Sequence, residues 1–189
     1  MDLQKLSVKF FVEQPHSVPL TDFIDVFHGW IQRTDGIYHD VADYSHMHAG
    51  PGIVLIAQDA HVSIDEADNR RGLLYSQKSR LDGSNQEKLR AAFRSTLEHC
   101  RKLEEEPALR GKLRFAANEV VISINDRLLG ENSPASSEQF RVEVAAAANR
   151  LFGNVAYTIE WDDHPRQRLN ARIKSNLAFN MCQALNNLQ

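Results

Sequence analysis

The sequence predicts an α+β protein, with a mainly antiparallel sheet covered by about three helices and a short C-terminal helix. Three observations favour this class: strands of alternating hydrophobicity are joined in hairpins, amphipathic helices separate the groups of strands, and the composition is globular. Hydrophobic residues are 42% and charged residues 25% of the 189 residues, a mixture that forms a packed core. This length predicts one domain over 1–189, and a subdivision would fall near 81–111.

The first part of the chain predicts one helix among several strands. Leu6–Glu13 alternates between apolar and polar residues as a half-buried strand does, and Thr21 caps the helix that follows. Ile37–Tyr44 predicts a second strand. The apolar run that opens Ile53–Ile64 predicts a central strand covered on both faces, and Leu73–Ser79 returns as a hairpin arm. Through residue 115, this part matches a ferredoxin-like unit with an extra strand.

The second part predicts two long helices with hairpins between them. Ser84 opens a capping box with Glu87, and the helix stops before a proline. Leu113–Phe115 and Val120–Ile124 predict a second hairpin. Ser136 opens another capping box before the next helix.

The C-terminal part predicts a hairpin and a short helix. Strands around Ile159 and Ile173 pair. Arg168, Arg172 and Lys174 share one strand face, and we expect them to oppose Thr158 and Glu160 across the hairpin. Ser175 caps the last helix. Its apolar row, which we expect to dock on a second copy of the chain, is Leu177, Met181, Leu185 and Leu188. The inward positions of all periodic segments predict a core of Phe10, Phe27, Trp30, Val54, Leu55, Phe93, Leu97, Ile122, Ile124, Val144, Leu151 and Ile159.

Charge and composition exclude several classes of protein. The net charge is −3, which lacks the basic excess of a nucleic-acid binder. The longest apolar run, Ile53–Ala57, is far shorter than the ~20 residues that span a bilayer. The two cysteines form no CxxC pattern, which excludes a cysteine zinc site, and the N-terminus lacks the features of a signal peptide. We therefore expect a cytoplasmic protein with no nucleic-acid or membrane partner.

Four of the eight histidines fall in the segment 39–61. His46 and His48 form an H-x-H pair, whose rings point to one face of an extended chain and can hold one divalent metal ion. His61 would be the third ligand, and Asp43 or His39 would orient a ligand or accept a proton. We expect these groups to share one concavity. The alternative is that the histidines cap turns and bond backbone groups.

Glycines and arginines near this segment are weaker candidates for ligand binding. Gly50 and Gly52 would let a ligand approach the backbone, although a tight turn explains them as well. Arg70 and Arg71 would hold an anion, although ion pairs with the acidic residues of the same loop are the simpler interpretation.

The combination DYSHMH-A-GPG followed by IVLIAQDAH resembles a group of uncharacterised bacterial proteins. The resemblance would cover most of the chain. It implies a bacterial, cytoplasmic protein and no known activity.

Two functions from different classes fit the sequence. The first, which we favour, is a non-catalytic module that binds a small-molecule ligand or self-associates as a homodimer. The second is a metal-dependent enzyme that acts on a small molecule through the segment 39–61.

Overall fold

In the computed structural model, which describes residues 1–125, 134–162, 168–178 and 180–189, the chain forms one eight-stranded sheet with helices. The strands are β1 (Leu6–Val12), β2 (Tyr38–Tyr44), β3 (Gly52–Ala57), β4 (Ala60–Asp65), β5 (Gly72–Gln77), β6 (Phe115–Ile124), β7 (Tyr157–Asp162) and β8 (Asn170–Ser175). The α-helices are α1 (Leu20–Arg33), α2 (Asn85–Glu105), α3 (Pro134–Phe152) and α4 (Met181–Asn187), and η1 (Ala67–Asn69) is a 3-10 turn.

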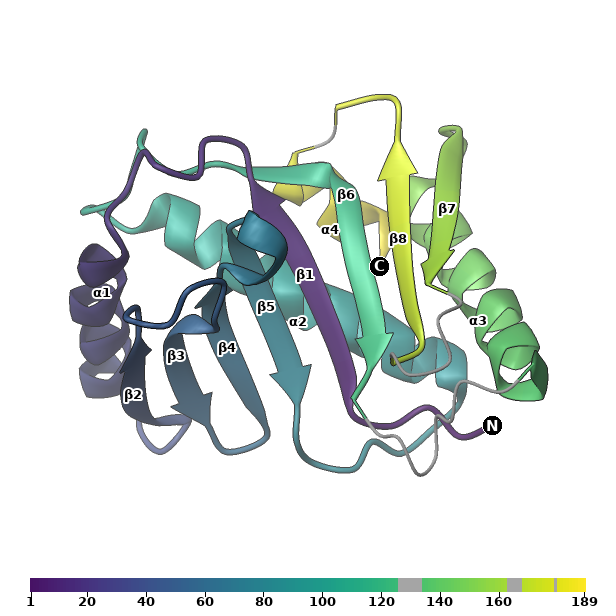
Figure 1. Cartoon of the computed structure of the whole chain (residues 1–189), viewed down its shortest axis with the longest axis horizontal. Coiled ribbons are helices and arrows are strands. Elements are labelled where there is room, and N and C mark those ends of the chain that lie inside the picture. The colour runs from purple at the N-terminus through teal and green to yellow at the C-terminus, as the bar shows by residue number, and fades with distance from the viewer. Residues whose placement is uncertain (126–133, 163–167, 179) are drawn as a thin grey trace.

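The sheet order is β2-β3-β4-β5-β1-β6-β8-β7, and every neighbouring pair is antiparallel (Figure 1). The predicted α+β class is therefore confirmed. From β1 to β6 the elements follow the ferredoxin-like order β-α-β-β-α-β, except that β3 and β4 are inserted between β2 and β5. The sequence predicts one extra strand here, and the structure has two.

The chain traces a similar path twice, although its sequence shows no repeat. β1, α1, the β2–β5 meander and α2 form the first unit, and β6, α3, the β7–β8 hairpin and α4 form a shorter second one. The units meet where β1 pairs with β6, so the order of strands runs outward from this pair in both directions. The middle of the sheet is therefore the junction of the two units.

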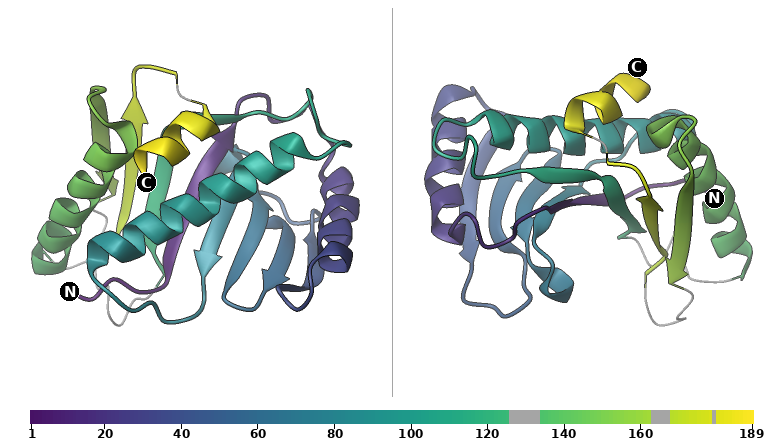
Figure 2. Two further views of the ribbon diagram at one scale, coloured as in Figure 1. Left: turned by 180° about the vertical axis from the view of Figure 1, so that it is seen from behind. Right: turned by 90° about the horizontal axis from the view of Figure 1, so that it is seen from above.

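All four helices lie on one face of the sheet (Figure 2). α2 packs on β1 and β5 and also touches α3 and α4, whereas α1 packs on β2 and β3 at one end. Residues 81–111 hold α2, which thus contacts elements of both units. The other face of the sheet, which we call the open face, carries no α-helix among the described residues; η1 lies in front of it (Figure 1).

The buried core lies between the helices and the sheet. Ten of the twelve predicted core residues are buried, and the two exceptions, Val54 and Ile159, are only partly buried. Val54 pairs with Ser63 and points away from its buried neighbour Leu55, because successive residues of a strand alternate between faces. The prediction of Val54 as an inward residue was wrong for this reason.

Two strand predictions need correction. Ile53–Ile64 is two strands, β3 and β4, which turn at Gln58 and Asp59, and β3 is covered by a helix on one face only. The expected hairpin over 113–124 is a single strand, β6. A shift of register between Phe10 and Phe11 absorbs extra residues of β6, so the chain stays extended where a turn was expected.

Three helices begin elsewhere than predicted. α1 starts at Leu20, so that Thr21 falls in its first turn, and α3 starts at Pro134, a residue suited to the first helical position. Ser175 belongs to β8, where it pairs with Tyr157, and the cap of α4 is Asn180.

The C-terminal row is used mainly within the chain. Met181 and Leu188 are buried and Leu185 is partly buried, because α4 packs on α2, α3 and β6. Leu177 precedes the helix and is 59% exposed. The row on which the homodimer was expected is thus mostly occupied, and the homodimer stays a prediction. No helix of the described residues is long and apolar enough to cross a membrane.

Candidate functional site

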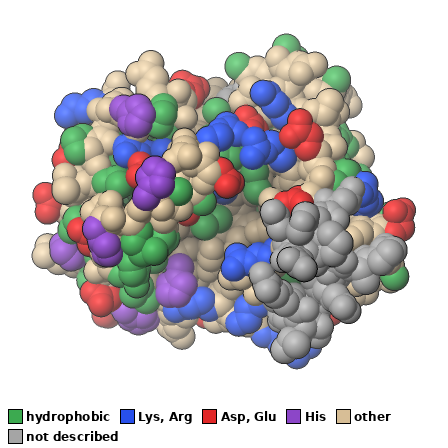
Figure 3. All heavy atoms as spheres, viewed as in Figure 1, with side chains coloured by type: hydrophobic (Ala, Val, Ile, Leu, Met, Phe, Trp, Pro, Cys, Tyr) green, Lys and Arg blue, Asp and Glu red, His purple; other side chains and the backbone are tan. Residues whose placement is uncertain are grey.

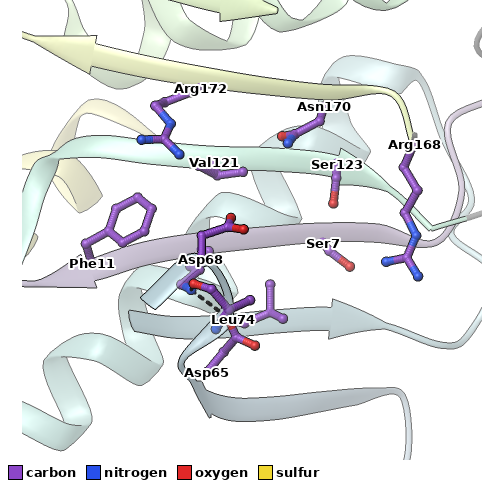
Figure 4. Close-up of a pocket in the computed structure, with 12 residues that line it drawn as sticks. Ser7, Phe11, Asp65, Asp68, Leu74, Val121, Ser123, Arg168, Asn170 and Arg172 are labelled. Atoms are coloured by element: carbon purple, nitrogen blue, oxygen red, sulfur yellow. Dashed lines mark hydrogen bonds and ion pairs between the residues drawn. The ribbon is translucent and has the colours of Figure 1, made fainter. Parts of the chain in front are cut away.

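The middle strands of the sheet present polar side chains on the open face. In β1, Leu6, Val8 and Phe10 face the helices, so alternation turns Ser7, Lys9 and Phe11 toward the other side. Register then fixes their neighbours, which are Leu74 of β5, Val121 and Ser123 of β6, and Asn170 and Arg172 of β8. Together with Asp65, Ala67, Asp68 and Arg168, these residues line a cavity of about 440 Å³, which we call the open-face pocket (Figure 4).

A buried ion pair forms one wall of the open-face pocket. Lys9 Nζ lies 2.5 Å from Asp65 Oδ2, and both side chains are less than a tenth exposed. Lys9 also donates to the carbonyl oxygen of Ala67, while Asp65 accepts the backbone N–H of Ala67. Because each charge has a second hydrogen-bond partner, the pair tolerates burial, and it fixes η1 against the sheet.

The Phe11 ring lies under several cations. The guanidinium of Arg70 stacks 3.8 Å from the ring centroid, and the cations of Lys9 and Arg172 lie at 5.3 and 5.8 Å. Each is within the range of a cation–π contact. An aromatic ring at this position holds the positive groups close together in spite of their mutual repulsion.

Glu119 is the carboxylate that these cations share. Arg70 binds it with two hydrogen bonds of 2.6 and 3.1 Å, and Arg172 approaches the same Oε1 at 3.4 Å. The hydrogen bond from Arg70 is the main cause that lowers the pKa of Glu119, and the charges of Arg172 and Lys174 lower it further. The same hydrogen bond raises the pKa of Arg70, to which nearby Asp68 also contributes. Three cations thus face two carboxylates, Glu119 and Asp68.

The other end of the open-face pocket is polar and uncharged apart from Arg168. Ser7, Ser123 and Asn170 lie in one row across β1, β6 and β8, and the Arg168 side chain points toward the same end (Figure 4). Asn170 Oδ1 is buried and has no hydrogen-bond partner among the described residues. A buried acceptor without a partner is costly, so a ligand that donates a hydrogen bond there would be favoured. Figure 3 shows Lys and Arg side chains around a hollow on this face.

The structure does not bring the predicted metal ligands together. His46 and His48 are exposed in the turn before β3, whereas His61 lies on β4 opposite Ile56, near the other end of β3. The length of β3 between them is about 13 Å at ~3.3 Å per residue. No group of three His, Cys, Asp or Glu side chains in the described part of the chain could hold a metal ion. Histidines scatter over the side of the molecule around β2–β4 in Figure 3.

No cavity found in the described part of the chain brings the predicted metal ligands together. His48 lines a separate cavity of about 320 Å³ with His16 and Arg71, and neither His46, Asp43 nor His61 lines it. Asp43 accepts the backbone N–H of Ser45, which lowers its pKa together with the Ser45 hydroxyl, the larger cause.

His39, the other candidate for orienting a ligand or accepting a proton, is exposed on the edge strand β2 and lies apart from the predicted metal ligands His46 and His48. The candidate glycines and arginines have structural roles.

Gly50 and Gly52 are explained by the backbone. Gly52 has a φ of +61°, and a Cβ there would lie 2.1 Å from the carbonyl oxygen of Ile64. The carbonyl of Gly50 accepts the N–H of Glu66. Glycine is thus needed at 52 for the close approach of β4, and the structure gives no ligand role to either residue.

Arg70 and Arg71 diverge in role. Arg71 donates to Glu66 and to the carbonyl oxygen of Val18, with a side chain only 9% exposed, as the simpler interpretation predicted. Arg70 instead reaches Glu119, 49 residues away, and joins the open-face pocket's cations. Sequence reasoning missed Lys9, Glu119 and Arg172 as site residues. The available indication was the polar face of Leu6–Glu13, which it assigned to solvent.

Fold and site together define an α+β protein with a charged pocket on the uncovered face of its sheet. A comparison with protein-family models, with curated proteins and with solved structures found no match for this chain. The resemblance to uncharacterised bacterial proteins therefore stays a prediction.

Proposed function

We propose that the protein is a non-catalytic module that binds a small anion bearing a hydroxyl group, such as a hydroxy acid or a sugar phosphate, in the open-face pocket. The observation that carries the proposal is the sharing of Glu119 by Arg70 and Arg172, with Lys174 near it. Asp68 near Arg70 and Glu160 opposite Arg172 on β7 offset part of this charge. The charged residues among the described lining of the pocket still have a net charge of +1, because Lys9, Arg168 and Arg172 outnumber Asp65 and Asp68. An anionic ligand would supply the missing charge.

The size and polarity of the open-face pocket support a small ligand. Its volume of about 440 Å³ lies at the lower end of the ~300–1,000 Å³ typical of ligand sites. Arg172 would bind the anionic group, since guanidinium geometry matches carboxylate and phosphate oxygens. Asn170 Oδ1 would accept a hydrogen bond from the ligand hydroxyl. Phe11 and Leu74 supply an apolar surface for its carbon atoms.

The carboxylates in and beside the open-face pocket favour binding over catalysis. Asp65 in its wall is held by Lys9 and by the Ala67 N–H, and Glu119, which lies beside the pocket, is held by Arg70. A general acid needs a raised pKa, but the pKa of Glu119 is lowered. The metal-dependent enzyme of the segment 39–61 has no comparable support, because its proposed ligands lie apart.

Calorimetric titrations with citrate, tricarballylate and pyrophosphate test this function. Citrate and tricarballylate differ only in a hydroxyl, so citrate should bind more tightly if Asn170 accepts a hydrogen bond from the ligand. Pyrophosphate tests whether phosphoryl oxygens are preferred to carboxylates. Arg172→Gln should weaken binding about tenfold or more, since charge-assisted hydrogen bonds are lost.

Arg94→Gln is the matched control. Arg94 pairs with Glu98 on the exposed surface of α2, on the helical side of the sheet, so its loss should leave anion binding unchanged. Binding that is absent in the native protein, or equally weakened by both substitutions, would contradict the proposal.

We also infer a cytoplasmic location, which the two unpaired cysteines support. Cys100 is buried in the core and Cys182 is exposed, and neither is in a disulfide.

A further inference from the structure

A second cavity lies on the helical side of the sheet, at the end near β2. It has a volume of about 380 Å³ and is formed by the α1–β2 connection, the β3–β4 turn, β5 and one face of α2. We call it the aromatic pocket. It shares no lining residue with the open-face pocket, so an inference about it stands apart from the proposed function.

The floor of the aromatic pocket is made of rings. Tyr38 and Tyr75 lie on either side of His99, with ring centroids 6.2 and 6.0 Å from the imidazole. His99 Nδ1 bonds the carbonyl oxygen of Ser95 at 2.7 Å, and Nε2 lies 3.1 Å from the Tyr38 hydroxyl. Because a carbonyl only accepts, Nδ1 carries a proton. Burial lowers the pKa of His99, which favours the neutral ring, and in the neutral ring Nε2 accepts from the Tyr38 hydroxyl.

The rim of the aromatic pocket is acidic. Asp35 and Asp59 line it from two different connections, and both residues are exposed. Asp59 Oδ1 accepts a hydrogen bond from Ser79. No Lys or Arg is among its described lining residues, although the ammonium of Lys78 donates to the carbonyl oxygen of the lining residue Ala57. The two carboxylates outnumber this one cation. Ile37, also on the rim, leaves a large apolar side chain 55% exposed.

The same group of rings already holds one ammonium group. Lys102 Nζ lies 3.8 Å from the centroid of the Trp30 ring and 5.0 Å from that of Tyr38. Lys102 does not line the cavity. Electron-rich ring faces therefore attract a cation at this place in the fold.

We infer that the aromatic pocket binds an organic cation: a primary or substituted amine with a small apolar body. The apolar body would rest against Tyr38, Tyr75 and Ile37, and the ammonium would lie toward Asp59. Anionic ligands would be repelled by the two carboxylates. The two pockets of the protein would then select ligands of opposite charge on opposite faces of one sheet.

An NMR titration with three matched probes tests the inference. Phenethylammonium, phenethyl alcohol and hydrocinnamate share the phenyl group and chain, and differ in carrying a positive, no or a negative charge. The ring resonances of Tyr38 and Tyr75 report binding. We expect phenethylammonium to bind about tenfold more tightly than the alcohol, and hydrocinnamate to bind least.

Two substitutions separate charge from ring contacts. Asp59→Asn keeps the acceptor for Ser79 and should lower the preference for the ammonium over the alcohol by about threefold or more. Asp25→Asn makes the same change on an exposed residue of α1 outside the cavity lining and should leave the preference unchanged.

Two results would overturn the inference. Equal affinity for the ammonium and the alcohol would remove the role of charge. Absence of ring shifts with every probe at about 10 mM would show that the cavity is not a binding site for this class of ligand. Because citrate binding is measured separately, failure here leaves the proposed function of the open-face pocket intact.

Discussion

The histidine-rich segment 39–61 and the open-face pocket both carry side chains that could bind a metal ion or a ligand, and they lie in different parts of the sheet. The segment 39–61 runs through β2, β3 and the start of β4 at one end, with its histidines close in sequence. The open-face pocket lies in the middle, where Lys9 and Arg172 line it and Glu119 lies beside it, on strands far apart in sequence. The imidazoles of the segment 39–61 lie apart, whereas Lys9 bonds Asp65 and Glu119 bonds both Arg70 and Arg172.

The difference arises from strand register. Consecutive strands of a meander reverse direction, so that residues before and after β3 fall at opposite ends of it. Side chains on neighbouring strands at the same level lie only ~4.5–5.5 Å apart at Cβ, whatever their separation in the chain. Proximity in sequence is therefore a poor guide to a site on this sheet. The following four predictions test that comparison, from the largest expected effect to the smallest.

Removing one partner of the buried Lys9–Asp65 pair should have the largest effect on stability. Lys9→Met leaves a buried carboxylate without its cation, which costs about 3–5 kcal/mol. The double variant Lys9→Met and Asp65→Leu should recover much of this loss, since no charge is left unpaired. Urea unfolding of the three proteins measures both effects. A single variant within about 1 kcal/mol of the native protein would mean that the pair is not desolvated.

Glu119→Gln should destabilise the protein less, by about 1–3 kcal/mol, because charge-assisted hydrogen bonds from Arg70 are weakened. The hydrogen bond from Arg70 lowers the pKa of Glu119 below 4.5. The stability that the ionised Glu119 contributes is therefore present above that pH and is lost as pH falls through the folded-state pKa. The difference in urea midpoint between the native protein and the Glu119→Gln variant should thus be smaller at about pH 3 than at about pH 7. Parallel pH curves would contradict this account.

His99→Leu tests a histidine outside the segment 39–61. The loss of the acceptor for the Tyr38 hydroxyl should cost about 1–1.5 kcal/mol at neutral pH. Burial lowers the pKa of His99 below 6.5, so the unfolded chain takes up a proton first as pH falls, and the native protein loses stability below about pH 6.5. The variant lacks this loss. The difference in urea midpoint between the native protein and the variant should therefore narrow as pH falls below about 6.5. A difference that stays constant would mean that His99 is solvated.

The double variant His46→Ala and His48→Ala should have the smallest effect. Both residues are exposed in the turn before β3, so unfolding free energy should change by no more than about 0.5 kcal/mol. Elemental analysis of the purified native and variant proteins should show the same metal content. A metal bound to the native protein and lost from the variant would restore the metal-dependent enzyme and reverse the comparison.

The sequence by itself determined much of the fold. Alternation in β1 identified Phe10 as inward, and helical periodicity identified Trp30, Phe93 and Leu97 as buried. The C-terminal hairpin that places Arg172 and Lys174 opposite Thr158 and Glu160 was also predicted correctly. These features depend on the period of a single element or on two strands joined by a short connection, and both are written in adjacent residues. Sequence periodicity did not predict that 53–64 is two strands, nor that β6 is continuous. An apolar run fits one strand as well as two strands joined by a turn.

Only the tertiary structure decided the composition of the candidate site. Arg70 was expected to pair within its own loop, yet it reaches Glu119, because β1 brings β5 and β6 to its two sides. Ser7 and Lys9 belong to a polar strand face that sequence reasoning assigned to water, and they line a pocket instead. Side-chain periodicity gives the face of a strand, but the order of strands gives its neighbours. That order depends on packing across the whole sheet, which no local pattern contains.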